Sequence, residues 1–441
     1  MTGDPTPHLE RFASHKHACR EFRRLVPETF NIANAILARH LDAVTRVALV
    51  EAKLGGLNTY TYGGLDYLSS KLSNVLTDLG VERDDSVALI LPQSAAAIIA
   101  QLAVLKLGAI AVPIDINLDA AGLEFALSDS APRVVIPHHT LRDRLRIVGA
   151  PIETVLTVYP PPPKFQDISP DYDFWRGVFE ASAEFKTVDT PADAPAFVFY
   201  ERSEGELRRW KHSHASLIYE LPAFEMSQNF KTKEDSTLWT PQDWTTVDSC
   251  LGSVYPALWY GWRVAASETH PQGGDALGLI ERCEITNTFM TLSGVDALRQ
   301  SNQLPETESG LTLRHIVCNS PVPNHVQEWA RHSLAGSINT IFSDTTFGSV
   351  AATCKRWYET PPGSPGRVTP GYSIETVDDR SAILPPRGIG RFAIRRELLE
   401  APVGLASCQP GDLADARDGW VVTHKVGFKD EDGNVWLSSS E

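Results

Sequence analysis

Apolar and polar positions alternate along the first third of the chain in the pattern of helices packed on a sheet. Between residues 62 and 80, apolar side chains recur on one helical face, and Gly80 closes the run. Three short apolar runs, separated by two further helical stretches, follow at residues 87–91, 109–115 and 132–138. Continuous apolar strands that alternate with helices predict a parallel sheet with both faces covered.

Proline-rich breaks divide the chain into candidate domains. Residues 157–195 interrupt the alternation, and a second α/β pattern starts with the apolar run at 194–200. After Pro361 the strands become short and are separated by turn residues, which predicts a small antiparallel barrel. A polar, basic run at 9–26 predicts a helix ahead of the first strand. We therefore expect four regions: a helical extension at 1–27, an α/β subdomain at 28–190, a second α/β subdomain at 191–355 and a β-barrel subdomain at 356–441.

Charge and composition exclude several classes of function. The 441 residues carry a formal net charge of -15, which repels nucleic acid and anionic membranes. The six cysteines include no CxxC pair, so the sequence predicts no zinc site and no disulfide framework. No signal-peptide core opens the sequence, and no apolar run reaches about 18 residues. We expect a cytoplasmic protein that binds neither nucleic acid nor membrane.

Several motifs then give the chain a family resemblance. The segments "TYTYGGL", "LWTPQDW", "GSPGRVTPGY", "LPPRGIGRFAIRR" and "KDEDGNVWL" resemble the adenylate-forming superfamily, and acyl-CoA synthetases in particular. The resemblance runs from about Phe30 to Trp436. It implies two flavodoxin-like α/β subdomains and a small antiparallel β-barrel. A mobile C-terminal domain with a catalytic lysine follows these in the family; we expect it to be absent, because the chain ends near the implied hinge.

The family reaction joins a carboxylate to AMP with release of pyrophosphate and then passes the acyl group to a thiol. Its phosphate loop is rich in serine, threonine and glycine and ends in Pro-Lys-Gly, so that backbone N–H groups and a lysine surround the triphosphate. The matching stretch here is "FVFYERSEGELRRWKHSH", residues 197–214. Of the small residues only Ser203 and Gly205 remain, and Arg208 falls at the lysine position.

Three glutamates change the charge of this loop: Glu201, Glu204 and Glu206. A carboxylate about 4 Å from a phosphate charge costs several kcal/mol at an effective dielectric constant of about 20. Arg208 and Arg209 either offset these carboxylates or simply pair with them. We expect a solvated, salt-bridged loop that does not hold ATP.

The other nucleotide motifs are altered as well. The adenine-side turn reads Asn319-Ser320-Pro321, which is a mild departure. The magnesium motif reads Asp344-Thr345-Thr346, and Thr346 replaces the family's glutamate ligand. The ribose-binding aspartate is replaced by Lys425, which can donate but cannot accept hydrogen bonds from a diol. Metal ligands are therefore not expected.

An aromatic segment is better preserved. "LWTPQDW" places Trp239, Asp243 and Trp244 beside the implied acyl pocket. These residues either line a surviving pocket for a small acyl or aromatic ligand or belong to the packed core. Cys318, close to the adenine-side turn, is either a reactive thiol or a buried structural residue.

A preserved scaffold with altered motifs predicts a catalytically degenerate, acyl-CoA synthetase-like protein. We expect a non-catalytic partner or regulatory subunit, associated with an active synthetase, another enzyme or a second copy of itself. Two alternatives stay open: a divergent enzyme acting on a carboxylate, and a sensor that binds an acyl or nucleotide ligand without turnover. No cofactor is expected, and ATP, magnesium and CoA enter only if family activity persists.

Overall fold

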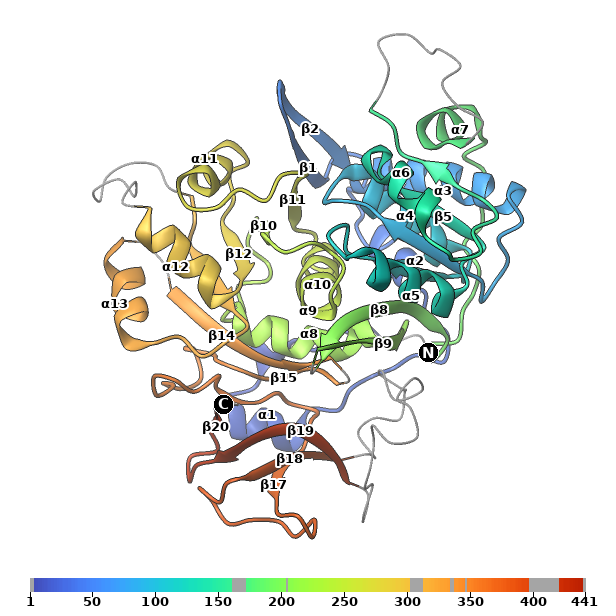
Figure 1. Ribbon diagram of the computed structural model, residues 1–441. Helices are drawn as coiled ribbons and strands as arrows, with labels where there is room; N and C mark the ends of the chain where they lie inside the picture. Colours follow the sequence, from blue (N-terminus) through green and yellow to red (C-terminus); the bar gives the residue numbers. More distant parts are fainter. Residues whose placement is uncertain are drawn as a thin grey trace.

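The computed structural model describes residues 4–160, 172–203, 205–301, 312–333, 337–345, 347–395 and 420–438. Two helix-covered sheets lie side by side, and a small sheet lies below them (Figure 1). The mixed α/β architecture expected from the sequence is confirmed. None of the described helices is long and apolar enough to cross a membrane.

The first sheet has five strands in the order β5-β3-β4-β8-β9. Strands β3, β4, β5 and β8 are parallel, and β9 runs antiparallel to β8. The predicted helix at 62–80 is α3, and Thr61 caps its start. The strands are β3 Ser86–Ile90, β4 Ile110–Pro113, β5 Val134–Pro137, β8 Pro195–Ser203 and β9 Glu206–Ser213; the helices around them are α2 Ile32–Leu37, α3 Tyr62–Asp78, α4 Ala95–Lys106, α5 Ala120–Ser130, η2 His139–Leu141, α6 Arg142–Ile147 and α7 Phe174–Glu180.

The second sheet has nine strands in the order β16-β15-β14-β13-β12-β10-β11-β1-β2. Its central six strands are parallel, and the strands at either edge are antiparallel. The strands are β1 Val47–Lys53, β2 Gly56–Thr61, β10 Thr237–Trp239, β11 Arg263–Ser267, β12 Asn287–Met290, β13 His315–Cys318, β14 Ser337–Asp344, β15 Gly348–Ala352 and β16 Arg367–Val368. The helices are α8 Ser216–Ser227, α9 Val247–Ser249, η3 Cys250–Val254, α10 Tyr255–Trp259, α11 Gly274–Arg282, α12 Leu292–Gln300 and α13 Asn324–Ser333.

The two large sheets are built from interleaved parts of the sequence. The β1–β2 hairpin, from within residues 28–190, pairs with β11 of the second sheet. Strands β8 and β9, from within residues 191–355, complete the first sheet. The boundary expected near residue 190 is therefore crossed by strand pairing in both directions.

The third unit is a four-stranded antiparallel sheet in the order β17-β18-β19-β20. It takes the place of the small barrel expected after residue 356. Its strands are β17 Ile374–Val377, β18 Gly390–Arg395, β19 Trp420–Lys429 and β20 Val435–Leu437, and a separate two-stranded sheet pairs β6 Leu156–Thr157 with β7 Tyr172–Asp173.

The N-terminal segment differs from the continuous helix expected at 9–26. It forms a 3-10 turn, η1 Leu9–Arg11, and a short helix, α1 His15–Glu21. The break has a local cause, because Phe12 is extended and the Ser14 side chain accepts a hydrogen bond from the His17 N–H as a new N-cap.

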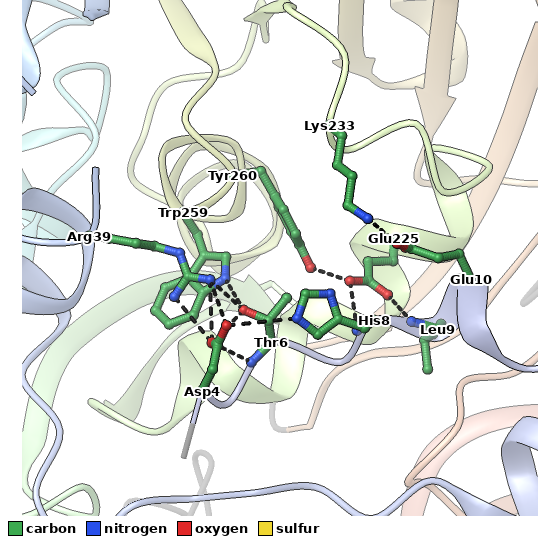
Figure 2. Close-up of polar contacts among 10 residues, drawn as sticks. All are labelled: Asp4, Thr6, His8, Leu9, Glu10, Arg39, Glu225, Lys233, Trp259 and Tyr260. Atoms are coloured by element: carbon green, nitrogen blue, oxygen red, sulfur yellow. Dashed lines mark hydrogen bonds and ion pairs between the residues drawn. The ribbon is translucent and has the colours of Figure 1, made fainter. Parts of the chain in front are cut away.

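Tertiary hydrogen bonds hold this segment on the second α/β unit (Figure 2). Both oxygens of the buried Glu225 carboxylate, on α8, accept backbone N–H groups, from His8 at 3.1 Å and from Leu9 at 2.6 Å. The Tyr260 hydroxyl donates to the same carboxylate at 2.6 Å. Arg39 stacks over the Trp259 ring at 4.0 Å. Glu225 was not identified from the sequence. The feature that could have indicated it is a carboxylate within a mainly apolar helix.

Candidate functional site

Residues that follow β13 and β14 of the large sheet contact Glu201 of the β8–β9 hairpin and Asp248 beside it. Asn319 follows β13, and Thr345 follows β14. Ligands of open α/β sheets bind outside the carboxyl ends of the strands. Asn319 donates a hydrogen bond to Asp248, and Thr345 donates one to Glu201 of the hairpin. The structure therefore brings several of the residues predicted from the sequence together.

The stretch expected to be a loop is a long β-hairpin. The ladder between β8 and β9 extends from Pro195, paired with Ser213, to Ser203, paired with Glu206. Gly205 forms the turn with φ +86°, a conformation that glycine adopts without a steric penalty. Residues 206–213 are therefore strand rather than loop, because their backbone groups pair with β8. Arg208 faces Glu201 in the ladder.

The arginines of the hairpin are held by carboxylates of the first α/β unit. Arg202 pairs with Asp119 at 3.2 Å, and Arg209 pairs with Asp129 at 3.3 Å. Asp129 also accepts a hydrogen bond from the Tyr200 hydroxyl at 2.6 Å. The sequence analysis expected Arg209 to offset or pair with the glutamates of its own segment, whereas its partner here is Asp129 of α5.

Glu201 occupies the centre of the edge between the two sheets. One of its oxygens accepts the backbone N–H of Val247 at 3.1 Å, and the other accepts the Thr345 hydroxyl at 2.9 Å. Burial, and then the nearby Asp248 carboxylate, raise the pKa of Glu201 to about 7. The side chain of Glu201, in the segment that matches the phosphate loop, is thus hydrogen bonded to Thr345, in the segment that matches the magnesium motif.

Asp248, at the start of the helical segment after "LWTPQDW", is the second carboxylate at this edge. It accepts the Asn319 amide at 3.4 Å. Burial raises the pKa of Asp248, hydrogen bonds from Ser343 and Asn319 oppose the rise, and Asp344 adds to it. Lys425 of β19 acts in the opposite direction on this pKa, so a cation of the small sheet faces the same cluster.

Glu220 of α8 forms a third, fully buried carboxylate behind the edge. It accepts the backbone N–H of Ser349, at 3.2 Å to one oxygen and 3.3 Å to the other. Burial raises the pKa of Glu220 to about 7. Gly348 allows this approach, since a Cβ at that position would overlap the Glu220 carboxylate.

Gly348→Ala is expected to destabilise the protein through two effects. The φ of +75° at this position costs an L-residue about 1–2 kcal/mol, and overlap with Glu220 adds about 1–3 kcal/mol. Gly433→Ala is the matched control, since Gly433 has φ +83° and a Cβ added there would meet no heavy atom within 4 Å. Thermal unfolding should give Gly348→Ala the lower midpoint; equal midpoints would show that the Glu220 contact is not tight.

The aromatic residues of "LWTPQDW" lie in the packed interior. Trp239 and Trp244 are 1% and 3% exposed and belong to different hydrophobic clusters. Both indole N–H groups are buried without a hydrogen-bond partner in the described chain. Asp243 pairs with His270 at 2.8 Å, and this hydrogen bond raises the pKa of His270.

The structure describes the remaining predicted residues only in part. Ser320 and Pro321 follow β13 in the bend that also holds Asn319. Thr346, Glu204 and the side chain of Ser203 lie outside the described residues. Cys318 is fully buried at the end of β13, and burial raises the pKa of its thiol to about 11. This environment is that of a structural cysteine, because a reactive thiol requires a lowered pKa.

Within the described ranges, one group of side chains is close enough to share a metal ion: His8, Glu10 and Glu225. It lies where the N-terminal segment meets α8 (Figure 2). Glu225 already accepts hydrogen bonds from His8, Leu9 and Tyr260, and Glu10 pairs with Lys233 at 2.5 Å. The group is therefore explained by internal hydrogen bonding.

Comparison with known proteins agrees with the geometry. The sequence profile of the family described as "AMP-binding enzyme" matches residues 38–400. The chain belongs to the AMP-binding enzyme family. It is 24% identical over 455 residues to the mitochondrial acyl-coenzyme A synthetase ACSM3 of Rattus norvegicus, with 97% of this chain and 75% of the relative covered.

Two solved structures show the same fold. The acyl-CoA synthetase of Brucella canis superimposes with a TM-score of 0.86 at 19% identity, covering 97% of this chain and 80% of the other. ATP-bound MatB from Rhodopseudomonas palustris gives a TM-score of 0.77 at 20% identity, covering 92% and 78%.

Proposed function

We propose that this AMP-binding family member does not form adenylates and acts as a non-catalytic partner or regulatory subunit. The observation that carries the proposal is the position of Glu201. Its carboxylate lies on the phosphate-loop segment and is hydrogen bonded to Thr345 of the magnesium-motif segment at 2.9 Å. Two segments that hold phosphate and metal in the family are here joined to each other.

Charge supports the same proposal. Asp248 and Asp344 both act to raise the pKa of Glu201, so three acidic groups share the edge where a triphosphate of about four negative charges would lie. Arg202 and Arg209 are paired with Asp119 and Asp129. The described residues therefore do not fit Mg-ATP, and they offer no route for a reaction that passes through it.

The preserved scaffold supports a role in binding another protein rather than a complete loss of function. The hydrophobic cores of both large units are continuous, and the hydrogen bonds around Glu220 and Glu225 tie distant segments together. A stable family fold without a nucleotide site suits a subunit that binds an active synthetase or another enzyme. CoA is not required for such a role.

The adenylation half of the proposal predicts no pyrophosphate exchange. The purified protein, incubated with Mg-ATP, labelled pyrophosphate and in turn acetate, hexanoate and benzoate, should return no label to ATP above the level without protein. A carboxylate-dependent exchange rate would overturn the proposal. The partner half predicts that adding the protein to an active acyl-CoA synthetase from the same cell gives a stable complex by light scattering. If no complex forms and exchange is still absent, the partnership with a synthetase is refuted and the absence of adenylation stands.

A further inference from the structure

A cavity of about 1020 Å³ lies between the first α/β unit and the β1–β2 edge of the nine-stranded sheet, and Glu201 is not among the residues that line it. It opens beyond the carboxyl ends of β3 and β5, where its wall includes Ser94, His138 and His139. The β1–β2 hairpin and helices α3 and α7 supply the other walls. These elements lie together on the upper side of the molecule (Figure 1).

The topology marks this position as a crevice between strands. After β3 the chain enters α4, whose residues pack in the core on one face of the sheet. After β5 it continues into α6, whose Leu145 packs in the core on the opposite face. Adjacent parallel strands whose connections leave to opposite faces form a crevice, and this is where ligands of open α/β sheets bind.

The walls of the cavity are mainly apolar and aromatic. Trp175 and Phe179 of α7 face Tyr67 and Leu68 of α3 across it. Phe179 is 74% exposed, which is unusual for a phenylalanine on a short helix. The aromatic side chains on the wall are Tyr60, Tyr67, Tyr159, Trp175 and Phe179. Cavities of this size with aromatic walls and a few polar groups are typical of small-molecule sites.

The charged side chains of the wall already contact other groups of the protein. Lys53 lies between Glu51, at 3.2 Å, and Glu268, with which it forms a close ion pair. Lys71 donates to the backbone carbonyl of Ala181. Arg282 lies at the exposed rim, in contact with the Cys283 thiol. An ionic ligand would have to break one of these pairs, so the wall favours a neutral molecule.

Two polar atoms of the wall have no partner. The Nδ1 of His139 and the hydroxyl of Tyr159 are buried and make no hydrogen bond within the described residues. The two rings lie 6.4 Å apart. A buried polar atom left unpaired costs about 1–3 kcal/mol, and a ligand that bonds to it recovers this cost.

We propose that this cavity binds a neutral, mainly apolar small molecule whose one polar group hydrogen bonds to Tyr159 and His139. The apolar body would lie against Trp175, Phe179 and Tyr67. The proposal is independent of the adenylation activity, because none of the residues that line the cavity belongs to the phosphate-loop, adenine-side or magnesium-motif segments.

Fluorescence titration with two probes of one skeleton tests the proposal. N-phenyl-1-naphthylamine is neutral and apolar, and 8-anilino-1-naphthalenesulfonate adds a charged sulfonate to the same skeleton. The full chain should bind the neutral probe at least about tenfold more tightly, because the anion must disrupt the paired charges. Equal or tighter binding of the sulfonate, or no saturable binding of the neutral probe, would overturn the proposal.

Matched variants locate the binding. Asn58 of β2 lines the cavity and is exposed, so Asn58→Trp should fill it and weaken the neutral probe at least about tenfold. Thr59→Trp, one residue along the same exposed strand and outside the wall, should leave binding unchanged. Tyr159→Phe should weaken the probe about three- to tenfold by removing the hydrogen-bond acceptor for its N–H group. Unchanged affinity in both Asn58→Trp and Tyr159→Phe would place the probe elsewhere.

Discussion

Raising the pH from about 5 to about 7.5 is expected to lower the resistance of the unaltered protein to urea relative to that of its Glu220→Gln variant. Burial raises the pKa of both Glu220 and Glu225 from 4.5 to about 7, and the two side chains are 3% and 1% exposed. The folded state therefore holds a proton on each group at a pH where the unfolded chain has released it.

The direction of the effect follows from this difference in proton binding. The stabilisation is complete below about pH 4.5, where both states are protonated, and it is lost as the pH rises towards 7, where the folded state must also ionise. One pKa unit corresponds to about 1.4 kcal/mol, so each buried carboxyl contributes a loss on the order of 2–3 kcal/mol. Burial lowers the pKa of His212, His214 and His315 to about 4, 3 and 4, and these groups act in the opposite direction, so the loss is measured as a difference between the unaltered protein and the variant.

Urea unfolding followed by tryptophan fluorescence measures this loss at the two pH values. Glu220→Gln keeps the shape of the side chain but cannot ionise, so the midpoint of the unaltered protein should fall relative to that of the variant between the two pH values. Glu281→Gln, at an exposed position on α11, is the control and should behave like the unaltered protein. An identical change of midpoint in Glu220→Gln and in the unaltered protein would contradict the assignment of a neutral buried carboxyl.

The first sheet was the part of the fold that local sequence patterns predict best. Its strands at 86–90, 110–113 and 134–137 are continuous apolar runs, and the helices between them have clear start and stop residues. Because burial on both faces imposes this pattern, it can be recognised without knowledge of the tertiary structure.

The strand at 206–213 could not be predicted in the same way. Its sequence "ELRRWKHS" is polar and carries four basic residues, and it becomes a strand because it pairs along its full length with β8. Likewise, the two sheets exchange strands between segments about 200 residues apart, as β1 does with β11. Pairing over such distances leaves no signal in local periodicity.

The sequence predicted which residues lie at the edge that matches the family's nucleotide site, but it did not predict the contacts that they make. Sequence comparison selected Asn319, Asp344, Thr345 and Lys425, and the structure gathers them around Asp248 and Glu201. Asp248 itself was not selected, because it matches no motif. Glu220 was missed for the same reason, although a carboxylate in the apolar run "SLIYELPAFEMS" is an unusual feature that could have been noted.

Failure to bind Mg-ATP is the second large effect expected of this protein. Glu201 occupies the hydrogen bonds of Thr345 and the Val247 N–H, and the acidic groups around it oppose a polyanion. Interaction of one carboxylate with one phosphate charge at about 4 Å costs about 4 kcal/mol at an effective dielectric constant of about 20, which is a factor of roughly a thousand in affinity. Removing this repulsion by Glu201→Gln should improve affinity but not restore a complete site, because Asp248 and Asp344 remain.

Isothermal titration calorimetry with Mg-ATP tests the absence of a nucleotide site most directly. MatB from Rhodopseudomonas palustris, which has been solved with ATP bound, serves as the positive control under the same buffer. We expect no saturable heat with the unaltered chain, corresponding to a Kd weaker than about 1 mM. Saturable Mg-ATP binding tighter than about 100 µM, competed by AMP, would contradict this expectation.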